Sequence, residues 1–177
     1  MSELLTIGHS VHEADEFLRM LRDNGVELLV DVRRYPASRR VPQFNSGVLA
    51  ETLHSAGIGY EHVEELGGRR SPAPDSANTG WRNEQFRGYA DHMASDEFDS
   101  ALTRLEADGR RTALMCAEAQ WVNCHRRLIA DALIARGHDV LHIDARGGTG
   151  PHELTDFAVV SADGRVTYPP VQESLEV

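Results

Sequence analysis

Short apolar runs alternate with helical patterns at least four times along the chain. Between these runs, apolar residues recur at the spacing of an amphipathic helix. Such alternation is typical of a parallel sheet that is covered by helices on both faces. The sequence therefore predicts an α/β fold with a three-layer arrangement and about five mostly parallel strands, formed by residues 4–8, 26–32, 59–66, 112–118 and 139–144.

The length and the C-terminal pattern predict one domain that ends in a hairpin. A chain of 177 residues is the size of an ordinary single domain, which we expect to cover residues 1–170. Residues 157–169 are expected to form a β-hairpin, because Asp163-Gly164 is a favourable turn between two apolar segments. The last seven residues, 171–177, are expected to be a flexible tail.

The sequence favours neither a membrane protein nor a secreted one. No apolar run approaches the roughly 18 residues of a spanning helix, and the N-terminus has no basic segment followed by an apolar core. Cys116 and Cys124 are the only cysteines, which suits reduced thiols better than a disulfide scaffold. We therefore expect a cytoplasmic protein that does not associate with membranes.

The charge balance is acidic, yet every basic side chain is an arginine. The formal net charge is −10, with 18 arginines and no lysine. An acidic surface disfavours non-specific binding to nucleic acid, although it allows a local basic site. Arg33, Arg34, Arg39 and Arg40 lie within eight residues. Because a guanidinium group binds two oxygens of a phosphate or carboxylate at once, this cluster is a candidate anion site.

Polar residues lie at or after the end of each expected strand. In strand order they are His9 and Ser10, Asp31 and Arg33, Glu64 and Glu65, Cys116 and Glu118, and Asp144. In open parallel sheets, ligands bind beyond the carboxyl ends of the strands. We therefore expect these side chains to share one pocket at that edge of the sheet.

Residues 114–126, LMCAEAQWVNCHR, concentrate reactive side chains where a strand leads into a helix. Asn123 is suited to cap a helix that begins at Cys124, which would place Cys124 and His125 in its first turn. The helix dipole and the unpaired N–H groups there favour anions and lower the pKa of a thiol. Cys124 is therefore a candidate nucleophile, Glu118 a candidate acid or base, and Cys116 either a packing residue or part of the site.

Two chemistries fit this stretch poorly. A phosphatase or sulfurtransferase loop would place an arginine after five intervening residues, but that spacing from Cys116 reaches Val122. Zinc could be bound by Cys116, Cys124 and His125, with His9 as a further ligand, but the cysteines are not paired as CxxC. We expect no metal site, and the sequence identifies no cofactor.

A third chemistry would use carboxylates. Asp31, Glu64 or Glu65, and Glu118 could cleave a glycosidic bond, because paired carboxylates support an oxocarbenium-like transition state. Nucleoside-processing enzymes on related open sheets use a glutamate nucleophile, which is an analogy of fold and not of site.

Several of these segments resemble the domain of unknown function 488 family. The resemblance runs from about residue 6 to 168 and is carried by TIGHS (6–10), LVDVRRYPASRR (29–40), FN (44–45), GIGYEHVEELGGRR (57–70), W with FRGYADHM (81–93) and ALMCAEAQWVNCHRRLIADAL (113–133). It implies a Rossmann-like α/β domain in a prokaryotic, cytoplasmic setting, but it supplies no reaction. The family motif is matched here by Asp31, Arg33, Cys116, Glu118, Cys124, His125 and Arg126.

The leading hypothesis is a small enzyme that acts on an anionic substrate, such as a nucleotide or a nucleic-acid-derived group. Arg33, Arg126 and the helix N-terminus at Asn123 would hold the anion, and residues 67–85 with Trp81 would close over it. The expected catalytic residues are Cys124, Glu118, Asp31 and Cys116. The expected substrate-binding residues are His9, Ser10, Arg33, Asn45, Trp81, Asn123, His125 and Arg126.

Two functions of other classes stay open. The protein could be a non-catalytic ligand or redox sensor whose two cysteines pair reversibly. It could also be a nucleic-acid-binding module that uses residues 33–40 and Trp81, in which case its affinity would depend strongly on salt. The expected partner is a small anionic ligand or nucleotide, since the net charge disfavours nucleic acid. The oligomeric state is not defined by the sequence.

Overall fold

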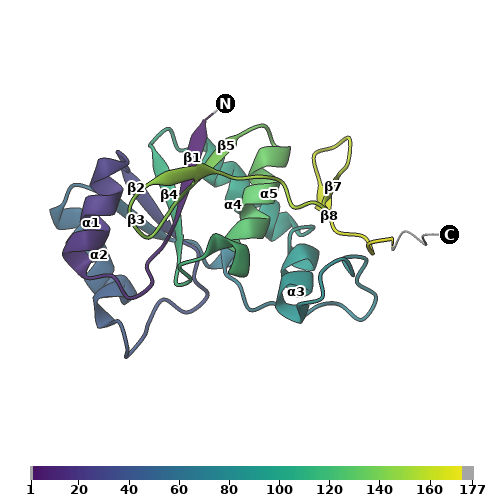
Figure 1. Cartoon of the computed structure of the whole chain (residues 1–177), viewed down its shortest axis with the longest axis horizontal. Helices are drawn as coiled ribbons and strands as arrows, with labels where there is room; N and C mark the ends of the chain where they lie inside the picture. The colour runs from purple at the N-terminus through teal and green to yellow at the C-terminus, as the bar shows by residue number, and fades with distance from the viewer. Residues whose placement is uncertain (1, 173–177) are drawn as a thin grey trace.

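The computed structural model describes residues 2–172 and has the predicted α/β architecture (Figure 1). Within those residues the main sheet has six strands in the order β3-β2-β4-β1-β5-β6. Its five parallel strands are β1 (Glu3–Gly8), β2 (Leu28–Asp31), β3 (Gly59–His62), β4 (Thr112–Cys116) and β5 (Asp139–Ile143). A short strand that was not predicted, β6 (Thr149–Pro151), pairs antiparallel with β5 at one edge.

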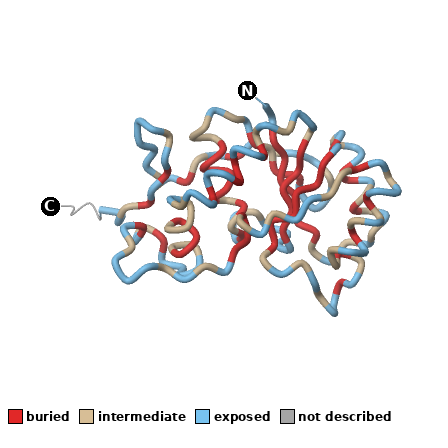
Figure 2. Tube along the Cα trace, turned by 180° about the vertical axis from the view of Figure 1, so that it is seen from behind, coloured by how far each residue is buried: buried red, intermediate tan, exposed pale blue. Residues whose placement is uncertain are grey.

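Helices cover both faces of the sheet, as the alternation predicts. α1 (Ala14–Asp23) and α2 (Ser46–Ser55) pack on one face, and α3 (Glu84–His92), α4 (Asp96–Ala107) and α5 (Arg126–Ala135) pack on the other. Figure 2 shows that buried residues are concentrated in the central strands. A strand that is buried on both faces needs apolar residues at successive positions, which makes it easy to recognise in the sequence. No helix within residues 2–172 is both long and apolar enough to cross a membrane.

The order of the strands creates a crevice at the carboxyl end of β4. β4 lies between β1 and β2 in the sheet. After β1 and β2 the chain passes to the face that carries α1 and α2, whereas after β4 it passes to the face that carries α5. Loops that diverge in this way leave room for a ligand. The fold therefore positions a site at the edge where the sequence predicts one.

One predicted helix start is wrong. Asn123 does not cap a helix that begins at Cys124; it ends a 3-10 turn, η3 (Trp121–Asn123), and α5 begins at Arg126. The backbone N–H groups of Asn123 and Cys124 donate to carbonyl oxygens of this turn, and the N–H of Arg126, which an Asn123 cap would have bound, donates to Cys124 Sγ. Cys124 has extended backbone, and it lies with His125 just before α5 rather than in its first turn.

The predicted C-terminal hairpin is present. It consists of β7 (Val159–Val160) and β8 (Val166–Thr167), and Gly164 in its turn has a φ of 80°, a conformation that favours glycine. Figure 1 shows the hairpin at the same end of the molecule as α3. Tyr168 follows β8, and its carbonyl oxygen accepts a hydrogen bond from the N–H of Gly80. The predicted tail falls largely on residues 173–177, which lie outside the described residues.

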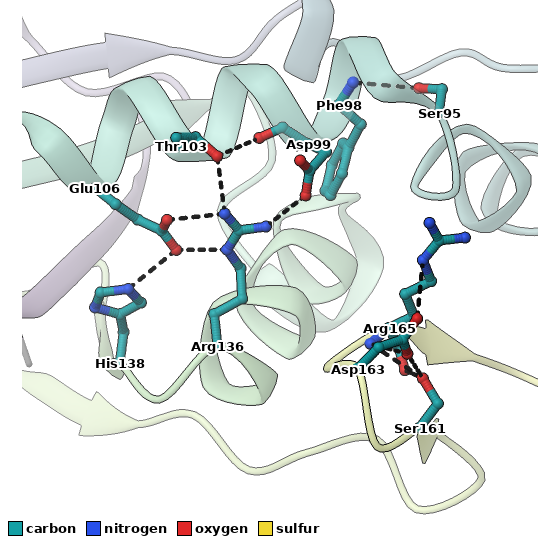
Figure 3. Close-up of polar contacts among 10 residues, drawn as sticks. All are labelled: Ser95, Phe98, Asp99, Thr103, Glu106, Arg136, His138, Ser161, Asp163 and Arg165. Carbon is teal, nitrogen blue, oxygen red and sulfur yellow. Dashed lines mark hydrogen bonds and ion pairs between the residues drawn. The ribbon is translucent and has the colours of Figure 1, made fainter.

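A charged network joins α4 to the end of α5 (Figure 3). Arg136 donates to both carboxylate oxygens of Glu106, at 2.6 and 2.9 Å, and to Asp99 at 2.8 Å. His138 lies 3.0 Å from the same Glu106 carboxylate. Burial raises the pKa of Glu106, but hydrogen bonds and charge from Arg136 and His138 outweigh this effect and hold the pKa below its ordinary value.

The substitution Glu106→Gln is expected to lower the free energy of unfolding by roughly 1 kcal/mol at pH 7, a modest value because water screens this partly exposed network. A group with a lowered pKa stabilises the folded state above its ordinary pKa, and this contribution is lost as the pH falls through the folded-state value. The difference between wild type and variant should therefore shrink below about pH 4. Urea unfolding of wild type and variant at pH 7 and below about pH 4 measures this difference in unfolding free energy. Glu51→Gln, on the exposed side of α2, is the control, and an equal loss there would contradict the account.

Candidate active site

A cavity of about 230 Å³ opens at the carboxyl end of β4. Six of the sequence-predicted site residues line it, and they come from the end of β4 and from the segments that follow β2 and β4: Arg33, Cys116, Glu118, Asn123, Cys124 and His125. The same segments add Arg34, Tyr35 and Ala117. The other walls are Gly68 and Arg69 before α3, and Gln85, Phe86 and Tyr89 of α3. The predicted pocket therefore exists, although only some of its predicted residues face it.

The two cysteines lie together at the cavity. Their sulfur atoms are 2.6 Å apart, and both side chains are buried, with 2% of Cys116 and 4% of Cys124 exposed. Both are free thiols. As free thiols in contact, one of them can donate its proton to the other sulfur, and two like charges this close repel, so the pair holds a second negative charge far less readily than a first one. The pair is therefore suited to one thiol and one thiolate.

His125 is oriented as a base toward Cys124. Its Nε2 lies 2.8 Å from the carbonyl oxygen of Val32, which can only accept a hydrogen bond, so Nε2 carries the proton. In the neutral ring, Nδ1 is then unprotonated, and it lies 3.6 Å from Cys124 Sγ. Gly68 allows the imidazole to pack close to the backbone, because a Cβ at that position would lie 2.9 Å from Nδ1. The three groups are therefore arranged as a nucleophile, Cys124, a base, His125, and a group that orients the base, the Val32 carbonyl.

The start of α5 stabilises negative charge on Cys124. The backbone N–H of Arg126 donates to Cys124 Sγ at 3.4 Å, so the sulfur occupies the place of a helix cap. Burial raises the pKa of Cys124, but the Cys116 thiol, His125 and Arg126 outweigh burial and hold the pKa well below its ordinary value. Burial and the neighbouring Cys124 sulfur raise the pKa of Cys116 well above its ordinary value. Of the two thiols, Cys124 is therefore the one that ionises first, and Cys116 is the hydrogen-bond donor to it.

Asp31 and Arg33 form a buried ion pair beside the cavity. Arg33 donates to the Asp31 carboxylate from Nε at 2.9 Å and from Nη2 at 2.7 Å, and Tyr60 donates to the same carboxylate at 2.6 Å. Asp31 is fully buried and Arg33 is 7% exposed. Because both carboxylate oxygens hold partners, Asp31 is placed to orient Arg33 rather than to reach a substrate.

His9 supports Arg33 from behind. Its ring stacks on Phe44 at 4.5 Å, Nδ1 donates to the carbonyl oxygen of Ser10 at 2.8 Å, and Nε2 accepts from Arg33 at 3.3 Å. Burial lowers the pKa of His9 to about 4, with the charge of Arg33 adding to this effect. His9 is therefore neutral above that pH, which is the state that lets Nε2 accept a hydrogen bond.

Residues 13–133 match the family described as Domain of unknown function DUF488. The chain belongs to this family. The match includes every residue that lines the cavity, whereas β1 and the segments from β5 onward lie outside it. No curated protein and no solved structure matches the chain. The description of the DUF488 family names no reaction.

Six sequence-predicted residues of this DUF488 chain do not line the cavity: Asp31, His9, Ser10, Asn45, Trp81 and Arg126. His9 and Asp31 support Arg33, and Ser10 lies in the following turn with a φ of 47°. Asn45 accepts a hydrogen bond from the backbone of Ser38 at 2.6 Å and so shapes the loop before α2. Arg126 lies behind Cys124 and is 1% exposed.

The expectation that Trp81 closes over a substrate is not matched by its position. Trp81 is 5% exposed and packs between Phe86, Phe157 and Tyr168 in the core. Only the ends of the predicted loop, at Gly68 and Arg69 and at Gln85, line the cavity. The indole is also unavailable for stacking on a base, which removes one support for a nucleic-acid-binding module.

Sequence reasoning missed the contributions of α3 and of the glycine pair before it. Phe86 and Tyr89 are spaced as on one face of a helix and pack at the core, yet the same side chains also line the cavity. The Gly67-Gly68 pair is a usable signal, because adjacent glycines before two arginines indicate close approach to another part of the chain. The group of carboxylates expected for a glycosidic bond is not assembled, since of those acids only Glu118 lines the cavity within residues 2–172.

Gly8 allows the loop after β4 to approach β1, and the substitution Gly8→Ala is expected to destabilise the protein. An added Cβ would lie 1.9 Å from the backbone oxygen of Glu118, so the loop that carries Glu118 would have to move. Overpacking of this kind costs about 1–3 kcal/mol. Urea unfolding measures the loss.

Gly47→Ala in α2 is the matched control for this substitution. An added Cβ at Gly47 meets nothing within 4 Å, so the stability should stay unchanged or rise by up to about 1 kcal/mol. If Gly8→Ala were as stable as wild type, the close packing of the Glu118 loop on β1 would be wrong.

Proposed function

We propose that this protein is an enzyme in which Cys124 is the nucleophile and His125 its base. The observation that carries this proposal is the sequence of contacts Cys124–His125–Val32 carbonyl at the base of the cavity. Cysteine enzymes need such an arrangement, because the thiolate reacts and the imidazole must present the correct nitrogen. We place the protein in the cytoplasm, where thiols are kept reduced.

The proposed reaction has two steps. In the first, His125 Nδ1 takes the thiol proton, and the Cys124 thiolate forms a bond to an electrophilic carbon of the substrate as the bond from that carbon to the leaving group breaks. The imidazolium then gives its proton to the leaving group. In the second, a water molecule or another acceptor attacks the same carbon while Glu118 takes its proton, and the bond to sulfur breaks to release the thiolate. The proton on Glu118 then passes through solvent to Cys124, which restores the starting thiol. Cys116 donates a hydrogen bond to the thiolate each time it forms.

The substrate is proposed to be anionic, such as a nucleotide or a nucleic-acid-derived group. Three arginines line the cavity, Arg33, Arg34 and Arg69, and Glu118 is the one carboxylate among the described lining residues. The guanidinium groups of Arg34 and Arg69 lie 5.9 and 5.6 Å from the ring centre of Tyr35, so cations and an aromatic face occur together at the rim. A cavity of about 230 Å³ is below the size that encloses a drug-like ligand, so it suits one reacting group while the anion stays at the rim.

A panel of nucleotides, nucleosides and sugar phosphates tests this proposal. We expect turnover of at least one member and a covalent adduct on Cys124 in the intact-protein mass, both of which Cys124→Ala abolishes. The double variant Arg34→Gln/Arg69→Gln should raise KM by about tenfold for each arginine, since a hydrogen bond to a charged group is worth about 1.5–3 kcal/mol.

The matched control is Arg39→Gln/Arg40→Gln, which removes two exposed arginines of the same loop that do not line the cavity. If both double variants change KM equally, the anion does not bind at the rim. If Cys124→Ala keeps wild-type turnover, or no member of the panel binds, the proposed function is wrong.

A redox sensor is the second candidate, because the two sulfur atoms are only 2.6 Å apart. In this reaction a hydroperoxide oxidises the Cys124 thiolate to a sulfenic acid and is reduced to its alcohol or to water. The Cys116 thiol then attacks that sulfur, the disulfide forms and water leaves. Hydrogen peroxide at equimolar concentration should then remove two hydrogens from the protein mass, reversibly with dithiothreitol. Glu118→Gln separates the two functions, because an enzyme should lose turnover while a sensor should still form the disulfide.

A further inference from the structure

A chain of buried polar side chains runs through the core behind Cys124. Thr6 of β1 lies 2.6 Å from Nδ1 of His142 on β5, and Nε2 of His142 lies 2.9 Å from Nδ1 of His152. Nε2 of His152 lies 2.7 Å from Asp131 of α5. All four side chains are at most 6% exposed. Arg126 joins the other end of this chain, since its Nη1 donates to Thr6 Oγ1 at 3.2 Å.

In this row of side chains, each hydrogen bond is donated in the same direction, from Thr6 toward Asp131. The Asp131 carboxylate is an acceptor, and it also receives the N–H of Thr155 at 3.0 Å and the hydroxyl of Tyr168 at 2.7 Å, so Nε2 of His152 must donate to it. In neutral rings, Nδ1 of His152 then accepts from Nε2 of His142, and Nδ1 of His142 accepts from the Thr6 hydroxyl. Burial lowers the pKa of His142 to about 3, with further effects from His152 and Arg126, which keeps this ring neutral.

A buried charged side chain lies at each end of this row of hydrogen bonds, Arg126 at one end and Asp131 at the other. Arg126 is 1% exposed, and among residues 2–172 no carboxylate lies within 4 Å of its guanidinium nitrogens. Its Nη2 donates to the carbonyl oxygen of Glu118 at 2.7 Å, and its Nε has no partner. Asp131 is fully buried. A buried charge is costly unless it is compensated, and a row of aligned hydrogen bonds polarises toward both of its ends.

We propose that Thr6, His142, His152 and Asp131 form a relay that holds Arg126 in its position behind Cys124, with Asp131 compensating the arginine's charge. The relay residues do not touch a substrate, so they are positioning residues that act through Arg126. The effect on Cys124 rests on the function proposed above, whereas the direction of the hydrogen bonds and the charge balance do not.

The Cys124 sulfur has few other charged or titratable neighbours. Cys116 faces it from β4, His125 and Arg126 from the start of α5, and Tyr89 from α3. Because none of the relay residues contacts Cys124 directly, a change in its reactivity after a relay substitution has to pass through Arg126.

The first test needs no variant. Nitrogen-15 NMR of the imidazole groups of the whole protein at pH 7 is expected to find the proton of the His142 ring and that of the His152 ring on Nε2, with Nδ1 of each ring accepting a hydrogen bond. A proton on Nδ1 of either ring would reverse the direction of the chain and overturn the proposal.

The second test measures the reactivity of Cys124 with iodoacetamide as a function of pH in Thr6→Val. This substitution keeps the shape of the side chain but removes the acceptor of Arg126 Nη1. The pH of half-maximal reactivity is expected to rise by about half a unit or more, where one unit is a tenfold change in ionisation. Thr112→Val is the matched control, because this buried threonine of β4 donates only to the backbone of Arg110. An unchanged profile in folded Thr6→Val would overturn the link to Cys124.

The third test asks whether Asp131 compensates Arg126. Arg126→Met and Asp131→Asn should each lower the Tm. In the Arg126→Met background, Asp131→Asn should lower the Tm by about half as much or less than in wild type, because the effects of coupled residues are not additive. Additive losses would contradict the charge balance. An inert Cys124 in wild type would refute the proposed function but leave the NMR result and this cycle as they stand, so the two failures can be told apart.

Discussion

The substitution His125→Gln is expected to lower the rate at which Cys124 reacts with iodoacetamide by up to about 100-fold at pH 6.5. A thiol with an ordinary pKa near 8.5 is only about 1% ionised at that pH, whereas a thiol with a strongly lowered pKa is mostly thiolate. Glutamine can still donate to the Val32 carbonyl, but it cannot accept the proton of Cys124 or carry a positive charge beside it. For the turnover of a substrate, loss of the base should cost about 10²–10⁴-fold in kcat.

His92→Gln is the matched control for this experiment. His92 also has Nε2 against a backbone carbonyl, that of Glu65 at 2.6 Å, and its ring also packs on Tyr89. It does not line the cavity. The control variant should react like wild type. An equal loss in both variants would mean that His125 acts through folding alone and not as the base of Cys124.

The substitution Arg33→Met is expected to cost about 3–5 kcal/mol of unfolding free energy, the largest loss of stability in the protein that we anticipate. It would leave the Asp31 carboxylate fully buried without its guanidinium partner, and an uncompensated buried charge is strongly destabilising. It would also remove the donor to the Phe44 carbonyl oxygen, at 2.6 Å. Chemical denaturation at pH 7 measures this loss.

The chain provides a close control for Arg33→Met. Asp108 and Arg110 repeat the same geometry two residues apart, with Arg110 donating from Nε at 2.9 Å and from Nη2 at 2.6 Å, but on the surface. Arg110→Met should therefore change stability little. The double variant Asp31→Asn/Arg33→Met should recover part of the loss, because it removes both charges. If Arg33→Met cost no more than Arg110→Met, the ion pair would not be a structural element of the site.

The alternation of strands and helices could be predicted because the burial of each element determines where its apolar residues lie in the sequence. Strands covered on both faces, such as LLVD in β2 and TALMC in β4, need apolar residues throughout, and helices need them on one face only. β6 escaped prediction, since TGP has neither apolar residues nor the length of an ordinary strand and exists only by pairing with β5. The fold class follows from local pattern, whereas this edge strand depends on a tertiary contact.

The location of the site could be predicted from the sequence, but the contacts between its side chains could not. Parallel topology alone brings Cys116, Glu118 and Arg33 to one edge. The predicted helix start is wrong because residues 121–123 form a 3-10 turn, and the N–H of Arg126, which Asn123 would have capped, donates to Cys124 Sγ instead. The pairing of Cys116 with Cys124 and the orientation of His125 depend on distances that no spacing encodes. Asp131, a lone acid within the apolar helix pattern LIADALIA, was a visible signal of the buried relay that sequence reasoning passed over.

The reactivity of Cys124 in the wild-type protein tests the central claim most directly. The reduced protein would be treated with iodoacetamide across a range of pH, and the modified cysteine identified by peptide mass. We expect Cys124 to react first, with half-maximal reactivity well below pH 8.5, while Cys116 stays unmodified. Reaction of Cys116 before Cys124, or no reaction of either thiol until the pH exceeds about 8.5, would contradict the assignment of Cys124 as the nucleophile.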